Sequence, residues 1–327
     1  MARPISVRGL TEGAILAALV AVLALAANYV PLVGLAANFL CPIPLAVLMI
    51  RHGLRVAALA TVVAIAIGSA ISGPVTGVLI LLGFAPVGLA IGFGLRRQWS
   101  ASTVILVTGA AVLGALVLGG VAAKIGVGVD PRVFAREVIE LNKRSFDDAV
   151  QRYGRLGLDT RQMDASVTMM RDFFDYSYRL IPMLLLVGSF ISAYLNYEVA
   201  RHVLRRVGVR APALPPMSMW GLPAVVLWVL PLLSLLAALG ARRVAPLEGL
   251  GTNLVFLIFF ALLSQGVLAG WVLMEKYRFP KWYRVIVILL FSSGPTGLLL
   301  FLLGLADAAL DLRRRWRPSA ELRASRV

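Results

Sequence analysis

The chain is poor in the residues that build most catalytic and metal sites. In 327 residues it has one cysteine, Cys41, and two histidines, His52 and His202. A single cysteine excludes an internal disulfide and a zinc site built on cysteine pairs. Both histidines lie in basic segments, where we expect them to face solvent. The sequence also contains no P-loop and no metal-ligand motif, so we expect no cofactor, no metal and no enzymatic activity.

Charge is scarce as well, and acidic charge most of all. Charged residues make up 15% of the chain, with 16 Asp and Glu against 32 Lys and Arg, while 60% of the residues are hydrophobic. A soluble domain of this length could not cover so much apolar surface. In a soluble protein a net charge of +16 would indicate nucleic-acid binding. Here the basic residues cluster at the ends of apolar runs, which predicts contact with the lipid bilayer and not with nucleic acid.

Long apolar runs are abundant, and most are close to the length of about 20 residues that crosses a bilayer as a helix. The first six runs cover residues 11–30, 34–50, 54–69, 75–95, 103–123 and 176–200. Further runs cover residues 221–240, 250–273 and 285–310. We therefore predict an all-α, polytopic membrane helix bundle. Its six-helix core lies within residues 1–210, two or three further membrane helices lie within 211–312, and a basic tail covers 313–327.

The first apolar run raises the question of a signal peptide, because Ala24-Leu25-Ala26 resembles a cleavage site. The run continues past Ala26, and another helix-length run follows it. We therefore expect an uncleaved first membrane helix.

Residues 130–175 form the one long polar stretch, and it is nearly charge-balanced. Asp130 followed by Pro131 is typical of a helix N-cap. Phe134 and Val138 then follow at helical spacing, and a second helix is expected to start at Asp159 or Asp164. We predict an amphipathic helical hairpin that lies on the membrane or caps the core.

Orientation follows from the distribution of Lys and Arg, which accumulate on the cytoplasmic side of membrane proteins. The short basic segments are the N-terminus and residues 51–55, 96–97, 201–210 and 275–284. All of them lie inside if the runs alternate, which places residues 130–175 outside and makes Arg242 and Arg243 an exception. We expect a multi-pass protein of the plasma (inner) membrane with a cytoplasmic N-terminus. The last run either crosses fully or re-enters at residues 292–297, and the basic tail favours the second alternative.

The first helix carries two pairs of small residues at a spacing of four, Ala14/Ala18 and Ala17/Ala21. Such small-xxx-small steps let another helix approach closely. The helix that approaches can belong to a partner protein or to the chain itself. The sequence therefore predicts a docking face at these four alanines without deciding between the two.

The first six runs resemble the substrate-binding subunit of energy-coupling-factor importers. The resemblance rests on one of these alanine steps, and on the proline-containing second run that is followed by Arg51–Arg55. It implies a six-helix fold, an N-terminus inside, and contact of the alanine step with a membrane coupling subunit.

The whole chain is more similar to the YybS-like family of bacterial membrane proteins. That family has the same core, a polar insertion before the sixth helix, additional C-terminal helices and an ending like the one that reads here Gly304-Leu305-Ala306-Asp307…Asp311-Leu312-Arg313. Importer subunits normally stop after six helices. The added residues 221–310 therefore distinguish the chain from a plain importer subunit.

Several polar residues flank the predicted outer ends of the first six helices. These residues are Asn28, Asn38, Ser69, Ser72, Lys124, Tyr176, Tyr178 and Arg179. They predict a solute-binding cavity beneath the hairpin, and Lys124 with Arg179 favours an anionic small-molecule solute. The alternative is that they anchor the protein at the lipid headgroups, where Tyr and Arg are common.

Two functions remain open at this stage. The protein is a solute-binding subunit of an importer that needs a partner for energy coupling, or it is a membrane scaffold or assembly protein without solute transport. Near the C-terminus, Asp307 and Asp311 lie one helical turn apart. They could bind a cation or hold a proton, but pairing with Arg313–Arg315 is the favoured interpretation.

Overall fold

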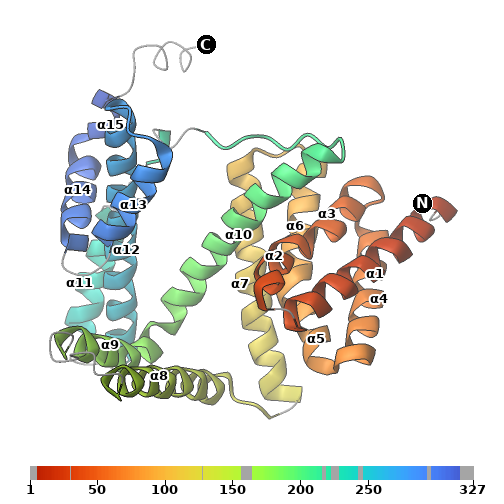
Figure 1. Cartoon of the computed structure of the whole chain (residues 1–327), viewed down its shortest axis with the longest axis horizontal. Coiled ribbons are helices and arrows are strands. Elements are labelled where there is room, and N and C mark those ends of the chain that lie inside the picture. Colours follow the sequence, from red (N-terminus) through yellow and green to blue (C-terminus); the bar gives the residue numbers. More distant parts are fainter. Residues whose placement is uncertain are drawn as a thin grey trace. The chain divides into compact units, whose positions relative to one another are not determined.

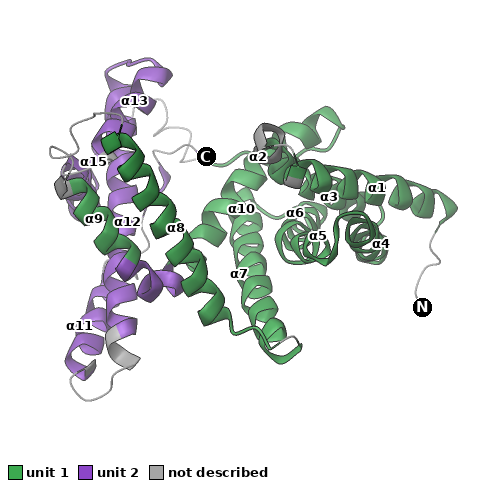
Figure 2. Ribbon diagram, turned by 60° about the horizontal axis from the view of Figure 1, so that its bottom comes forward, with its two compact units in different colours: residues 1–174, 184–214 green, residues 175–183, 215–327 purple. Residues whose placement is uncertain are grey.

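The structure is a computed structural model. It describes residues 6–29, 31–126, 128–155, 164–215, 219–221, 228–241, 246–292 and 296–316. Regular secondary structure in these ranges is entirely helical. The chain divides into two compact units, residues 1–174 with 184–214 and residues 175–183 with 215–327 (Figure 2). The predicted six-helix core of residues 1–210 includes residues 175–183, which belong to the second unit, so the boundary at residue 210 stays a prediction.

Six helical segments of the described chain are long and apolar enough to span a membrane. They are Val7–Ala27, Leu54–Ser72, Pro74–Arg96, Ala101–Gly126, Ser166–Arg206 and Gly249–Lys276. Shorter apolar helices cover Ala36–Arg51, Leu230–Gly240 and Gly297–Leu310. The predicted all-α, polytopic membrane bundle is therefore confirmed.

Prolines determine how the second apolar run folds. After α1 (Val7–Tyr29), the run forms two short helices, α2 (Pro31–Leu40) and α3 (Pro42–Arg51), with a break at Cys41. Proline cannot donate the backbone hydrogen bond that would continue α2. The side chains of α3 are buried from Pro42 to Met49, so the break redirects the chain into the core of unit 1.

Glycines set the closest helix contact of unit 1. The next two membrane helices are α4 (Leu54–Ser72) and the segment formed by α5 (Pro74–Leu79), a π-helical turn (Ile80–Phe84) and α6 (Ala85–Arg96). Helices α3 and α6 lie side by side (Figure 1). A Cβ atom on Gly88 would collide with the carbonyl oxygen of Pro42, and one on Gly92 would come within 2.7 Å of that of Ala46. The glycine row therefore serves close packing.

Asp130 fixes the corner between the fifth membrane helix and the hairpin. Helix α7 (Ala101–Gly126) is followed by α8 (Pro131–Arg155). The backbone N–H of Arg132 donates to Asp130 Oδ1 at 2.9 Å, and Lys124 Nζ lies 3.2 Å from Asp130 Oδ2. Both contacts lower the pKa of Asp130 below its ordinary value, and the hydrogen bond from the Arg132 N–H has the larger effect. The Asp130–Pro131 pair thus caps α8 as expected.

The polar stretch folds into two helices, α8 and α9 (Asp164–Ser177). The predicted start at Asp159 lies outside the described residues, and which residue starts α9 stays a prediction. A turn at Tyr178–Leu180 connects α9 to α10 (Ile181–Arg206). The rings of Phe146 and Phe174 lie 5.9 Å apart, and Arg171 Nε donates to Asp147 Oδ1 at 2.8 Å. Helix α8 has no buried residue.

Unit 2 contains α11 (Leu230–Ala241), α12 (Pro246–Lys276), α13 (Lys281–Ser292), α14 (Gly297–Leu310) and α15 (Leu312–Trp316). The last apolar run is thus divided between α13 and α14, and residues 293–295 between them lie outside the described residues. A Cβ atom on Gly266 of α12 would collide with the carbonyl oxygen of Leu300, and one on Gly304 with that of Leu262. The backbones of α12 and α14 are therefore in direct contact. The side of the membrane on which the tail lies stays a prediction.

Candidate functional site

The two alanine steps of α1 face in different directions. Ala17 and Ala21 are 0% and 1% exposed, and Ala17 packs in a core cluster with residues of α3 and α4 such as Leu45 and Ala57. Ala14 and Ala18 are exposed on the adjacent face, about 60° around the helix from Ala17 and Ala21 at 3.6 residues per turn. The apolar side chains of Ile15, Leu19 and Val22 are exposed beside them. Ala17 and Ala21, the inner step, therefore pack within unit 1. Ala14 and Ala18, the outer step, are exposed on its surface.

The predicted polar residues of unit 1 lie on four helices, α1, α2, α4 and α7. Ser69 and Ser72 are half-buried at the end of α4, where Ser69 Oγ lies against Gly77. Ser72 Oγ is buried without a hydrogen-bond partner among the described residues. Lys124 pairs instead with Asp130. Asn38 is exposed, and the side chain of Asn28 lies outside the described residues.

The remaining predicted polar residues belong to unit 2. The guanidinium of Arg179 lies 5.7 Å from the centre of the Tyr176 ring. Asn253 Nδ2 donates to the carbonyl oxygen of Arg179 at 2.7 Å, and Asn253 Oδ1 accepts from the N–H of Met183 at 3.0 Å. Tyr178, the third predicted polar residue of unit 2, lies in the turn before α10. A single cavity lined by the residues of both units stays a prediction.

A polar group that the sequence did not indicate surrounds Glu12 at one end of unit 1. Glu12 Oε2 lies 2.8 Å from His52 Nε2 and 3.6 Å from Arg51 Nη1, and Glu12 Oε1 accepts from Arg8 Nε at 3.1 Å. The side chain of His52 is only 16% exposed, so the expectation that it faces solvent is wrong. Its partner is forty residues away in the sequence, and only the packing of α1 against α3 brings the two together.

Asp307 and Arg313 form a buried ion pair in unit 2. Arg313 Nε donates to Asp307 Oδ2 at 2.7 Å, the Arg313 backbone N–H donates to Asp307 Oδ1 at 2.9 Å, and Gln265 Nε2 donates to Asp307 Oδ2 at 2.7 Å. Both carboxylate oxygens thus accept hydrogen bonds from the protein. The favoured pairing of Asp307 with the basic segment is confirmed.

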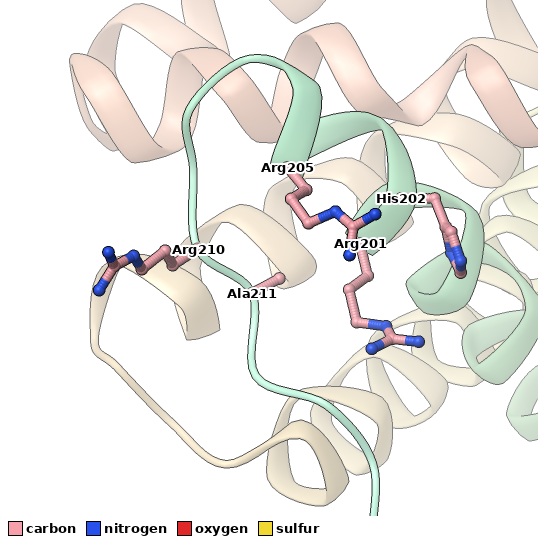
Figure 3. Close-up of a pocket in the computed structure, with 5 residues that line it drawn as sticks. All are labelled: Arg201, His202, Arg205, Arg210 and Ala211. Atoms are coloured by element: carbon pink, nitrogen blue, oxygen red, sulfur yellow. The ribbon is translucent and has the colours of Figure 1, made fainter.

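A basic cavity of about 290 Å³ lies where α10 ends (Figure 3). It is lined by Arg201, His202, Arg205, Arg210 and Ala211. The first three project from the last turns of α10, and the other two lie on the segment that follows. Arg201 Nη2 donates to Glu198 Oε2 at 2.8 Å, so Glu198 pairs with one of the arginines that line the cavity. The sequence showed the basic charge here but not the cavity.

A family of predicted membrane proteins, DUF2232, matches residues 18–308, which is most of the chain. The protein belongs to the DUF2232 family. The uncharacterized protein YybS of Bacillus subtilis (strain 168) is 24% identical over 310 residues, which cover 94% of this chain and 98% of that protein. No solved structure matches the chain. The expected YybS-like membership is confirmed, and a DUF2232 protein with six candidate spans is an integral, multi-pass membrane protein in contact with lipid.

Proposed function

We propose that this DUF2232 protein is a non-enzymatic membrane scaffold that docks a partner membrane protein. The outer alanine step of α1 carries the proposal. Ala14 and Ala18 are exposed one helical turn apart, and both are small enough for the backbone of a second helix to approach. Packing of α1 against its own unit does not account for them, because Ala17 and Ala21 fill that role.

The chemistry of the step favours a transmembrane helix as the occupant. Ile15 and Leu19 are exposed beside the two alanines on one side, so the surface is lower at the alanines than at these larger apolar side chains. Lipid chains are as apolar as leucine and gain little from this lower surface. A partner helix gains close van der Waals contact along its backbone. In this scaffold α1 lies in the plasma membrane with its N-terminus in the cytoplasm, in line with the basic inner segments.

Site-specific photocrosslinking in intact cells tests the docking. A photoreactive amino acid at Ala18 should yield a discrete adduct with a second membrane protein. Val62 of α4 is also exposed and apolar, and it lies outside the alanine step. The same probe at Val62 should give only lipid adducts. Lipid adducts alone at both positions, or an adduct between two copies of this chain, would contradict docking of a distinct partner.

A second candidate function is solute binding as a subunit of an importer, which would also need a membrane partner. One observation favours it: the buried hydroxyl of Ser72 has no hydrogen-bond partner among the described residues and lies near Ser69 in α4. A bound polar solute could satisfy it. Thermal-shift screening of the purified protein tests this function. A ligand that raises Tm in the wild type but not in Ser72→Ala would support it, and a screen of small anionic solutes without such a shift would leave the scaffold as the function.

A further inference from the structure

The basic cavity at the end of α10 has features of a built binding site. Its lining comes from two segments, the last turns of α10 and the residues after them, and four of its five residues are Arg or His. The hydroxyl of Tyr197 donates to the carbonyl oxygen of Pro212 at 2.7 Å, which ties the second segment to α10. Val209 and Ala211 pack against the core cluster that contains Tyr197. Arg210 is therefore carried by an anchored segment.

The cavity holds more positive charge than its surroundings neutralise. Glu198 pairs with Arg201, and its carbonyl oxygen lies 2.7 Å from His202 Nδ1. Arg205 and Arg210 make no ion pair with a carboxylate among the described residues. Arg205 and Arg210 thus remain for an anion. Figure 3 shows their side chains extending in opposite directions, so each would act as a separate guanidinium, which can hold phosphate oxygens through two parallel hydrogen bonds.

Three other arginines at the predicted inner ends of the helices are already engaged. They are Arg51 beside Glu12, Arg96 donating to the carbonyl oxygen of Met49, and Arg97 over the ring of Phe93. Those arginines need no further role beyond setting orientation and packing. Arg55 and Arg206 are likewise exposed without an ion pair among the described residues, and Arg205 and Arg210 differ from them in lining a cavity.

The position of the cavity identifies the class of anion. It lies at the end of the candidate span Ser166–Arg206, which is where lipid headgroups meet the protein. A volume of about 290 Å³ suits a phosphate-bearing headgroup rather than a whole lipid. We propose that this cavity binds the phosphate headgroup of an anionic phospholipid of the inner leaflet. The site is independent of the docking face on α1.

Binding of phosphatidylglycerol to the full-length purified protein tests the proposal, and native mass spectrometry counts the bound lipids. The double variant Arg205→Gln/Arg210→Gln should weaken phosphatidylglycerol binding by about tenfold or more, because it removes both uncommitted guanidinium groups. Arg55→Gln/Arg206→Gln is the matched control, because it removes the same charge from exposed arginines that do not line the cavity. It should change the affinity by about twofold or less. Phosphatidylcholine should bind all three proteins alike.

The arms of the experiment separate the sources of the phosphate group. If inorganic phosphate alone bound as tightly as the lipid, with the same loss in the cavity variant, the ligand would be a soluble phosphate and the lipid assignment would be overturned. An equal loss in both double variants would show general charge attraction and would also overturn it.

A measurement on the wild-type protein keeps the test independent of how the variants fold. A phosphatidylglycerol analogue with a photoreactive headgroup should crosslink to residues 201–211. Crosslinks found only in the basic loop at residues 51–55 would contradict the proposed site.

Discussion

Arg313 and Asp307 form the most deeply buried ion pair that the described residues contain, with side chains that are 4% and 1% exposed. The carboxylate accepts hydrogen bonds from the guanidinium, the backbone of Arg313 and Gln265. This ion pair and its hydrogen bonds connect α12, α14 and α15. The helices α12 and α14 are also in backbone contact at Gly266 and Leu300. Buried charges in membrane proteins are retained for function or for specific structure. Here the full set of partners on Asp307 favours structure.

Removing one partner of this ion pair should therefore lower the stability of the folded protein. In Asp307→Asn the guanidinium of Arg313 loses its counter-charge, and we expect the free energy of unfolding to fall by about 3–5 kcal/mol. Reversible denaturation of the purified protein measures this value. The exposed pair Glu140–Arg144 offers a control, because Glu140→Gln should change the stability by about 0.5 kcal/mol or less. Similar effects of the two substitutions would show that the buried pair contributes no more than a surface pair.

The contact between α12 and α14 predicts a second sensitive position. Gly304→Ala places a methyl group where the carbonyl oxygen of Leu262 lies, so the helices must separate and we expect a loss of about 1–3 kcal/mol. Gly249 lies in the partner helix α12, but no atom of a neighbouring segment is within 4 Å of the place that a Cβ atom would take there. Gly249→Ala should be neutral or slightly stabilising, because alanine favours helix. A loss in Gly249→Ala equal to that in Gly304→Ala would argue against a specific backbone contact.

The position of the hairpin tests the orientation. Asp148 is exposed on α8, whereas its neighbour Asp147 is paired with Arg171 and is a poor site for a probe. Asp148→Cys in a Cys41→Ala background should react with an impermeant thiol reagent on intact cells, because the charge-balanced stretch is expected outside. Labelling that occurs only after lysis would reverse the orientation of every span.

The corner at Asp130 should respond to acid. Because its pKa is lowered in the folded protein, the carboxylate stabilises the start of α8 above the ordinary aspartate pKa, and this contribution is lost as pH falls through the lowered value. Amide exchange at Arg132 and Phe134, whose N–H groups donate to Asp130, should remain slow at neutral pH after correction for the intrinsic rate and accelerate only in strong acid. Asp130→Asn should exchange faster at neutral pH and lose this dependence. Equal protection in the two proteins would exclude a role for the charge.

Hydropathy predicted the spans of this protein well but not which faces of the helices are buried. Pro42 accounts for the break in the second run, and Asp130–Pro131 predicted the start of α8, since both are local effects of the backbone. In a membrane, however, side chains that face lipid and side chains that face the core are both apolar. The period that marks the buried face of a soluble helix is therefore weak.

The two alanine steps show this limit directly. Ala14/Ala18 and Ala17/Ala21 have the same residue types and the same spacing, and only the neighbouring helices make one internal and the other external. The Glu12–His52 contact was missed for a related reason, because it joins residues that are distant in the sequence. The basic cavity likewise depends on the anchoring of the segment after α10 by Tyr197, which no local pattern indicates.

A comparison of Ala17→Leu with Ala18→Leu tests most directly whether α1 uses one face for its own core and offers the other to a partner. Ala17→Leu should lower the free energy of unfolding of the isolated protein by about 1–3 kcal/mol, because the larger side chain overpacks the core. Ala18→Leu should change it by about 0.5 kcal/mol or less and abolish the crosslink formed from a probe at Ala14. If Ala18→Leu destabilised the isolated protein as much as Ala17→Leu, or left the crosslink intact, the docking function would be contradicted.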